Sequence, residues 1–110
     1  MNDLSFKLLR RANIIRDNEW DPGDRITLSF RGNELAGECG EACNIIKKIE
    51  RERLGLPGSR ATLADLAQEL ADIIICTDLI AMQFGIDLGV EVKAKFNATS
   101  VKQKLLTRIA

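Results

Sequence analysis

The segment TLADLAQELADIIICTDLIAMQFG, residues 62–85, decides the fold class of this chain. Thr62 followed three residues later by Asp65 is a capping-box signal for the start of a helix, and the closing glycine is a signal for its end. Between these signals, apolar residues surround the second half of the helix on nearly all sides, so it needs partners on more than one face. Alternating Val, Ile and Thr runs are almost absent from the chain. The sequence therefore predicts an all-α fold.

Three further helices are predicted along the chain. The first covers Leu4–Asp17 and ends at the turn that contains a proline and a glycine. The second begins between Arg25 and Ser29 and ends near Leu54, before a loop with two glycines and a proline. The fourth is short and covers Asp87–Phe96, with the aspartate as its cap. We expect the four helices to form a bundle that homo-oligomerisation completes.

The length and charge of the chain narrow its class. At 110 residues it is long enough for one domain and too short for two of ordinary size, so residues 1–110 are expected to form a single domain. Sixteen basic residues balance sixteen acidic ones, which argues against a nucleic-acid partner. The N-terminus lacks the apolar core of a signal peptide, and the most apolar stretch, Ile73–Met82, is too short for a membrane span and contains Asp78. We expect a cytoplasmic protein with no membrane partner.

The residue types that are absent exclude several chemistries. Without histidine there is no Ser-His-Asp or Cys-His catalytic set, no His-ligated zinc site and no Glu-x-x-His di-iron pair. Cys39, Cys43 and Cys76 have spacings that match neither Cys-x-x-Cys metal sites nor a disulfide framework, so we expect reduced thiols in the core. Any hydrolytic chemistry must therefore use carboxylates.

Two pairs of carboxylates, each at i, i+3 spacing, lie on the second and third predicted helices. The first pair is Glu38 and Glu41, and the second is Glu69 and Asp72. Residues at this spacing are neighbours on one helix face and can hold one cation from the same side. Four oxygen donors without nitrogen or sulfur favour Mg²⁺ or Mn²⁺ over zinc or copper. The two pairs are the candidate metal ligands.

Helical periodicity turns both pairs toward the apolar sides of their helices. Glu34 and the first pair lie within roughly 40° of the direction of Ile45. The second pair lies on the side that Cys76 occupies one turn later. An unpaired charge turned into a helix interface costs several kcal/mol or more, and a divalent cation would remove that cost. The alternative is an ordinary solvated acidic face.

The second helix and the loop after it add two expectations. The two carboxylate pairs lie at different distances from the loop along their helices. To place them side by side, the loop GLPGSRA must run back along the second helix by roughly 9 Å. Gly37 and Gly40 lie inside the acidic segment, where each costs about 1 kcal/mol relative to alanine. They predict either close helix packing or a ligand near the backbone.

The strings GECGEACNIIKK (residues 37–48) and ELADIIICTDLIA (residues 69–81) resemble the MazG-type nucleoside triphosphate pyrophosphohydrolases of the all-α NTP pyrophosphatase superfamily. The resemblance covers roughly residues 28–100. It includes Lys95–Ser100, which is similar to the lysine and asparagine segment that closes the site in small members. The fuller family motif has a further glutamate where this chain has Gly37, and Glu34, one turn earlier, is the candidate substitute.

The resemblance implies Mg²⁺-dependent hydrolysis of a (deoxy)nucleoside triphosphate to the monophosphate and pyrophosphate, which would serve to clean the nucleotide pool. The implied metal ligands are Glu38, Glu41, Glu69 and Asp72. Metal held there would neutralise phosphate oxygens and lower the pKa of a bound water that attacks the α-phosphorus. Glu41 is the preferred general base, with Glu38 and Glu34 as alternatives.

A triphosphate also requires cationic and stacking partners. Lys48 continues the acidic face two turns after the first pair, and Lys95 and Lys102 flank Asn97, so these four residues are candidates for substrate binding. Trp20, the single tryptophan, is a candidate for stacking on the base. The alternatives are ordinary surface lysines, a helix cap for the asparagine and a lid on the core for the tryptophan.

The apolar surround of the third helix exceeds what one thin bundle of this length can bury, so we expect at least a homodimer. The resembled family is commonly dimeric or tetrameric, which implies a homodimer or homotetramer. Two other functions are alternatives. One is a non-catalytic helical interaction module, which Gly37 favours, and the other is a hydrolase of a related phosphoanhydride such as phosphoribosyl-ATP.

Overall fold

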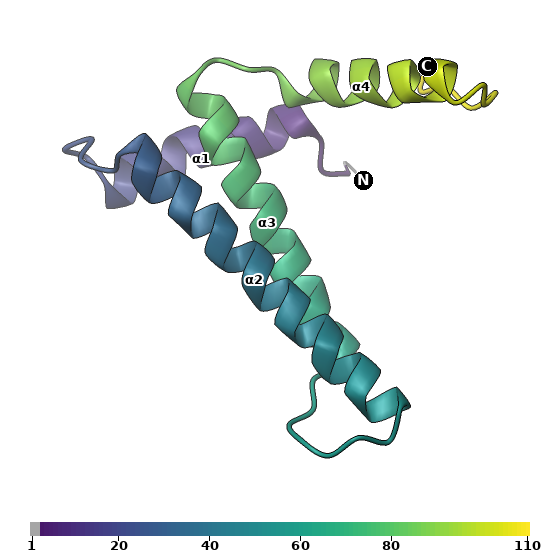
Figure 1. Cartoon of the computed structure of the whole chain (residues 1–110). Coiled ribbons are helices and arrows are strands. Elements are labelled where there is room, and N and C mark those ends of the chain that lie inside the picture. Colours follow the sequence, from purple (N-terminus) through teal and green to yellow (C-terminus); the bar gives the residue numbers. More distant parts are fainter. Residues whose placement is uncertain (1–2) are drawn as a thin grey trace.

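The computed structural model describes residues 3–110, and every regular element in this range is an α-helix (Figure 1). The helices are α1 (Phe6–Trp20), α2 (Leu28–Arg53), α3 (Leu63–Gln83) and α4 (Leu88–Lys102). The prediction of an all-α fold is confirmed. Within the described range no single helix is long and apolar enough to cross a membrane, and α3 and α4 reach such length and hydropathy only jointly, across a bend of 108°.

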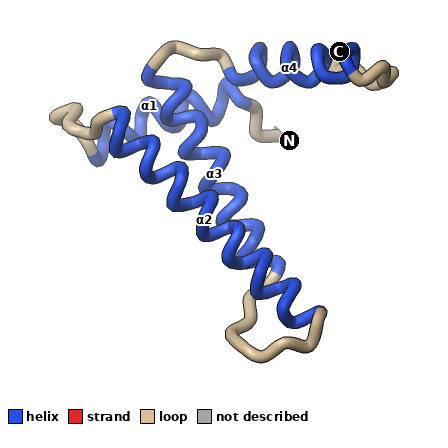
Figure 2. The backbone as a smooth tube through the Cα atoms, viewed as in Figure 1, coloured by secondary structure: helices blue, strands red, loops and turns tan. Residues whose placement is uncertain are grey.

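The two longest helices form an antiparallel hairpin. α2 and α3 lie side by side and are joined at one end by a loop of residues 54–62 (Figure 1). α1 packs against α3 near the opposite end. α4 contacts α1 and projects away from the hairpin, as the tube in Figure 2 makes plain. The four helices of one chain therefore do not close into a bundle.

The bounds of α2 and α3 agree with the predicted ones because local caps define them. Thr27 begins α2, and its hydroxyl oxygen accepts a hydrogen bond from the Phe30 backbone N–H at 3.1 Å. Thr62 and Asp65 form the predicted capping box before α3, with reciprocal hydrogen bonds of 3.1 and 2.9 Å. Gly55 follows the end of α2 with a φ of 71°, a left-handed conformation that glycine adopts at little cost.

The predicted bounds of α1 and α4 were wrong. α1 is capped by Ser5, which accepts from the Leu8 N–H, and it runs three residues further than expected to Trp20. No proline or glycine interrupts residues 18–20, so the helix continues until the turn itself. α4 runs past Phe96 to Lys102, because residues 97–100 include no glycine or proline that would end the helix.

The apolar core of a single chain is small. The buried hydrophobic residues are Ala42, Cys76, Leu79 and Ala81, which lie on α2 and α3. The expectation that all three cysteines are core thiols was wrong, because Cys39 and Cys43 are exposed and only Cys76 is buried. Helical periodicity places Cys39 and Cys43 away from the face of α2 that meets α3. Because so few apolar side chains are buried, the position of α1 depends on polar contacts.

Asp78 is the centre of the polar contact between α1 and α3. It has no solvent exposure, although it lies in the most apolar stretch of the chain. The Arg10 Nε donates to both carboxylate oxygens, at 3.1 and 3.2 Å, and the Asn13 amide donates to one of them at 2.9 Å. Arg10 also donates to the Ile86 carbonyl oxygen. A buried charge paired in this way fixes the position of α1 on the hairpin.

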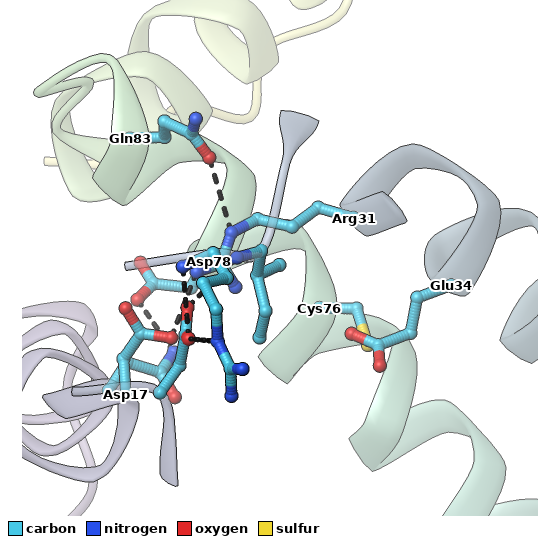
Figure 3. A network of polar contacts seen from close by, with 10 residues as sticks. Asp17, Arg31, Glu34, Cys76, Asp78 and Gln83 are labelled. Carbon is cyan, nitrogen blue, oxygen red and sulfur yellow. Dashed lines mark hydrogen bonds and ion pairs between the residues drawn. The ribbon is translucent and has the colours of Figure 1, made fainter. Parts of the chain in front are cut away.

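Arg31 makes a second set of contacts that joins three helices. This residue of α2 is 4% exposed, and its guanidinium donates to Asp17 of α1 at 2.9 Å and to Gln83 of α3 at 3.2 Å (Figure 3). Sequence reasoning missed this set and the one around Asp78. The available signal was a carboxylate inside an apolar run, which must find donors when its helix is buried.

Candidate metal centre

The loop between α2 and α3 brings the two acidic segments level, as the sequence required. Glu41 lies twelve residues before the end of α2, whereas Glu69 lies six residues after the start of α3, a difference of roughly 9 Å along the helix axes. The loop covers this difference (Figure 1). Arg51 stabilises the loop by donating to the Ser59 carbonyl oxygen at 3.0 Å.

Three carboxylates meet between the two helices. One oxygen each from Glu38, Glu41 and Glu69 lies within 4.8 Å of the other two. Glu38 and Glu69 are half-buried and Glu41 is exposed. The Oε2 atoms of Glu38 and Glu69 are removed from solvent and have no hydrogen-bond partner. We call these three residues the acidic cluster.

Close approach of the three groups changes the protonation of Glu69. Its pKa is raised to about 7, first because its protonated carboxyl could hydrogen-bond the Glu38 carboxylate, then because of burial, and then because of Glu41. Two ionised carboxylates cannot hydrogen-bond each other, so the buried oxygens lack a donor unless a proton or a cation lies between them. Without a cation the cluster therefore retains a proton near neutral pH.

The geometry of the acidic cluster suits a small divalent cation. Oxygen ligands lie about 2.1 Å from Mg²⁺, so two oxygens on opposite sides of the ion are about 4.2 Å apart. The three oxygens of the cluster lie within 4.8 Å of one another, which is close to this span. The two buried Oε2 atoms have no partner within the chain, and a cation is a partner that carboxylate oxygens accept. The residues therefore fit Mg²⁺ or Mn²⁺.

Asp72, the fourth predicted ligand, is not one of the three gathered residues. It is exposed and lies one turn further along α3, toward Cys76. Burial raises the pKa of the Cys76 thiol to about 11, and the charges of Glu34, Glu38 and Asp72 add to this effect. The thiol donates to Glu34 Oε1 at 3.7 Å, and the two side chains face each other in Figure 3. Glu34, a candidate base, thus lies beside the acidic cluster and outside it.

Two of the predicted substrate-binding residues, Lys48 and Trp20, lie on α2 and at the end of α1. Lys48 is half-buried two turns beyond Glu41, near the start of α3, where its charge helps to lower the pKa of Asp65 after the hydrogen bonds from Thr62. Trp20 ends α1 and is 62% exposed, with the Arg16 guanidinium 5.1 Å from its ring centroid. The lysine is on the same hairpin as the acidic cluster, whereas the tryptophan precedes α2, whose first ten residues separate it from Glu38.

The other three predicted substrate-binding residues, Lys95, Asn97 and Lys102, lie on α4, which points away from the hairpin (Figure 1). The Asn97 side chain has partners within the chain. Its amide nitrogen donates to the Ile109 carbonyl oxygen at 3.0 Å, and its oxygen accepts from the Ile109 N–H at 2.8 Å. Within one chain Asn97 therefore fastens the C-terminal tail to α4, and it neither caps the helix nor faces the acidic cluster.

The two glycines of the acidic segment are not explained by close packing within the chain. A Cβ at Gly37 or Gly40 would meet no atom within 4 Å. Close packing within the chain, one of the two reasons predicted from the sequence, is therefore ruled out, and a ligand near the backbone stays a prediction.

Comparison with known proteins gives no match. No family model, no curated protein and no solved structure is significantly similar to this chain. Its function is therefore inferred from its own residues and from the motif resemblance.

Proposed function

We propose that this chain is a Mg²⁺-dependent nucleoside triphosphate pyrophosphohydrolase of the MazG type. The observation that carries the proposal is the acidic cluster, in which Glu38 and Glu69 hold buried oxygens without a donor. The resemblance of the strings around residues 37–48 and 69–81 supplies the reaction, hydrolysis to the monophosphate and pyrophosphate. Mn²⁺ is the alternative metal, since it accepts the same oxygen ligands.

Glu38 and Glu69 would hold the cation, because their inward oxygens have no other partner. Bound there, Mg²⁺ supplies Lewis-acid chemistry: it offsets the charge of phosphate oxygens and makes water a stronger acid. Glu41 is the most exposed member of the acidic cluster, so its free oxygen is the best placed to accept a proton from water. Glu34, one turn before Glu38 on α2, is the candidate for a second acceptor.

Lys48 is the cationic side chain that the hairpin itself offers to a phosphate group. It follows Glu41 on α2 by two turns, about 10 Å of helix, which matches the reach of a triphosphate from its α- to its γ-phosphorus together with a flexible lysine side chain. Asp65 has its hydrogen-bond partners in Thr62, and Lys48 acts on it only through its charge.

The proposal is tested by assaying pyrophosphate and monophosphate release from a panel of NTPs and dNTPs with Mg²⁺. We expect the wild-type chain to release both products, and the variants Glu38→Gln and Glu69→Gln to lose activity by at least a hundredfold. Glu52→Gln is the matched control, because Glu52 is an exposed glutamate of α2 outside the acidic cluster. Its activity should equal that of the wild type.

Binding of Mn²⁺, followed by electron paramagnetic resonance, separates the two parts of the proposal. Binding that Glu69→Gln abolishes, together with intact nucleotides, would retain the metal centre and reject the reaction. Intact nucleotides without metal binding would reject both.

A further inference from the structure

A cavity of about 360 Å³ lies where the first turns of α1 meet the turn between α3 and α4. Figure 1 shows the start of α1 beside the start of α4. We call this space the α1–α4 cavity. One of its lining residues, Gly85, follows Glu69 by sixteen positions, which is about 24 Å at the rise of a helix. The cavity is therefore separate from the acidic cluster.

Apolar and basic side chains line the α1–α4 cavity together. The apolar ones are Phe6, Ile14 and Leu88, and the basic ones are Lys7, Arg10 and Arg11. Helical spacing places the five residues that belong to α1 on one face of that helix. Like charges three and four residues apart on a helix repel each other, so an anion bound at this face would stabilise it.

Arg10 holds a fixed hydrogen-bond donor at the cavity. Its Nε donates to the Asp78 carboxylate, and its Nη2 donates to the Ile86 carbonyl oxygen at 2.6 Å. The Arg10 side chain is 20% exposed. Among the described residues its third nitrogen, Nη1, has no hydrogen-bond partner, and it is not one of the polar atoms removed from solvent. The guanidinium is therefore held in place with one nitrogen free to donate to a ligand.

The charges at the cavity leave an excess of one positive charge. Asp78 balances Arg10. Asp87 is the single carboxylate that lines the cavity, and one of its oxygens already caps the start of α4. Lys7 and Arg11 form no ion pair with any other described residue. Two cations beside one carboxylate favour a ligand with a single negative charge.

We infer that the α1–α4 cavity binds a small organic acid, which is a carboxylate monoanion with an apolar body. The carboxylate accepts charge-assisted hydrogen bonds from Arg10 Nη1 and from Arg11, and the apolar body packs on Phe6, Ile14 and Leu88. At about 30 Å³ for each water-sized group, the cavity holds about twelve non-hydrogen atoms, and octanoate is of this size. This inference stands without the proposed hydrolase activity.

Isothermal titration calorimetry of the 110-residue chain with octanoate tests the inference. We expect saturable binding of one equivalent. Acetate lacks the apolar body and octylammonium carries the opposite charge, so each should bind at least tenfold more weakly. In ¹⁵N NMR spectra octanoate should shift the amide signals of Gly85 and Leu88, which line the cavity.

Substitutions on α1 separate the cavity from the rest of the helix surface. Arg11→Gln should weaken octanoate binding at least fivefold, whereas Arg16→Gln removes the same charge outside the cavity and should leave binding unchanged. Ile14→Ser should weaken binding at least fivefold, and its matched control, Ile15→Ser, should not. All four side chains are exposed, so circular dichroism should show that each variant remains helical.

Absence of saturable octanoate binding to the wild type would overturn the inference. Equal weakening by Arg11→Gln and Arg16→Gln would also overturn it, because the attraction would then be non-specific. Equal binding of octanoate and octylammonium would show adsorption of any alkyl chain on exposed apolar surface and would reject the anion site. Loss of binding as the protein concentration rises would show that a second copy fills the cavity, which would reject the organic acid as its occupant.

Discussion

Glu38 on α2 and Glu69 on α3 each hold one carboxylate oxygen away from solvent and without a hydrogen-bond donor, although 31 positions separate them in the sequence. Such an arrangement is unfavourable for two ionised groups. A shared proton or a bound cation relieves it, and the raised pKa of Glu69 reports the first of these. A cation bound at the acidic cluster would therefore relieve the unfavourable burial of these two oxygens.

The pH dependence of stability in metal-free protein follows from this pKa. The Glu69 pKa is about 7 in the folded chain and 4.5 for an ordinary glutamate, so the folded state binds more protons between these values. The stabilisation that this extra proton binding gives the folded state is fully present below pH 4.5 and is lost as the pH rises to 7. Urea unfolding in EDTA should show wild-type stability falling relative to Glu69→Gln across this window. If the free energies of unfolding of the two proteins differed by the same amount at every pH, the raised pKa of Glu69 would be contradicted.

Removal of the Asp78 carboxylate should strongly destabilise the fold. Asp78→Ala leaves Arg10 and Asn13 without their buried acceptor, and loss of one partner of a buried ion pair costs about 3 to 5 kcal/mol. Asp72→Ala, an exposed aspartate of the same helix, should change stability by less than about 0.5 kcal/mol. The free energy of unfolding from urea titration checks both values. Equal effects would show that the buried contacts contribute nothing.

Replacement of glycine by alanine should change stability in opposite directions at Gly37 and Gly58. Gly37→Ala has open space around the new methyl group and should stabilise α2 by about 1 kcal/mol. Gly58→Ala should destabilise by at least about 1 kcal/mol, because Gly58 has a φ of 128° and a Cβ there would lie 2.7 Å from an Arg51 nitrogen. Thermal unfolding at low protein concentration distinguishes them. Stabilisation by Gly58→Ala would show that the loop is not held as described.

The Asn97 contact should protect the tail from hydrogen exchange. Asn97→Ala removes both hydrogen bonds to Ile109, so the Ile109 amide should exchange at least tenfold faster. Helix α4 itself should keep its protection up to residue 96, because the Asp87 cap at its start is unchanged. Exchange followed by NMR makes the comparison. Unchanged protection of Ile109 would mean that the tail is held by other contacts.

Local signals predicted the elements whose ends are fixed by local hydrogen bonds. The Thr62 and Asp65 capping box and the glycine after α2 are readable in the sequence because the groups that form them are three or four residues apart. The end of α4 was misjudged because residues 97–100 carry no strong stop signal, and the actual turn uses Lys104 in a conformation typical of glycine.

The site was predictable in its central part for a similar reason. Helical spacing alone places Glu38 and Glu41 on one face, and the apolar surround of α3 turns Glu69 toward it. The position of Asn97 depends instead on a tail that folds back over twelve residues, and that of Asp78 on donors from another helix. The Asn97 contact leaves no pattern along the chain, and the carboxylate of Asp78 inside an apolar run signals a need for donors without showing which residues supply them.

Titration of the metal-free chain with Mn²⁺ at pH 8, followed by electron paramagnetic resonance, tests the central claim most directly. We predict saturable binding that Glu38→Gln and Glu69→Gln abolish, that Glu52→Gln leaves unchanged, and that weakens below pH 7 as protons compete for Glu69. Absence of saturable binding to the wild type, or equal binding to Glu69→Gln, would contradict the account of the acidic cluster as a metal centre.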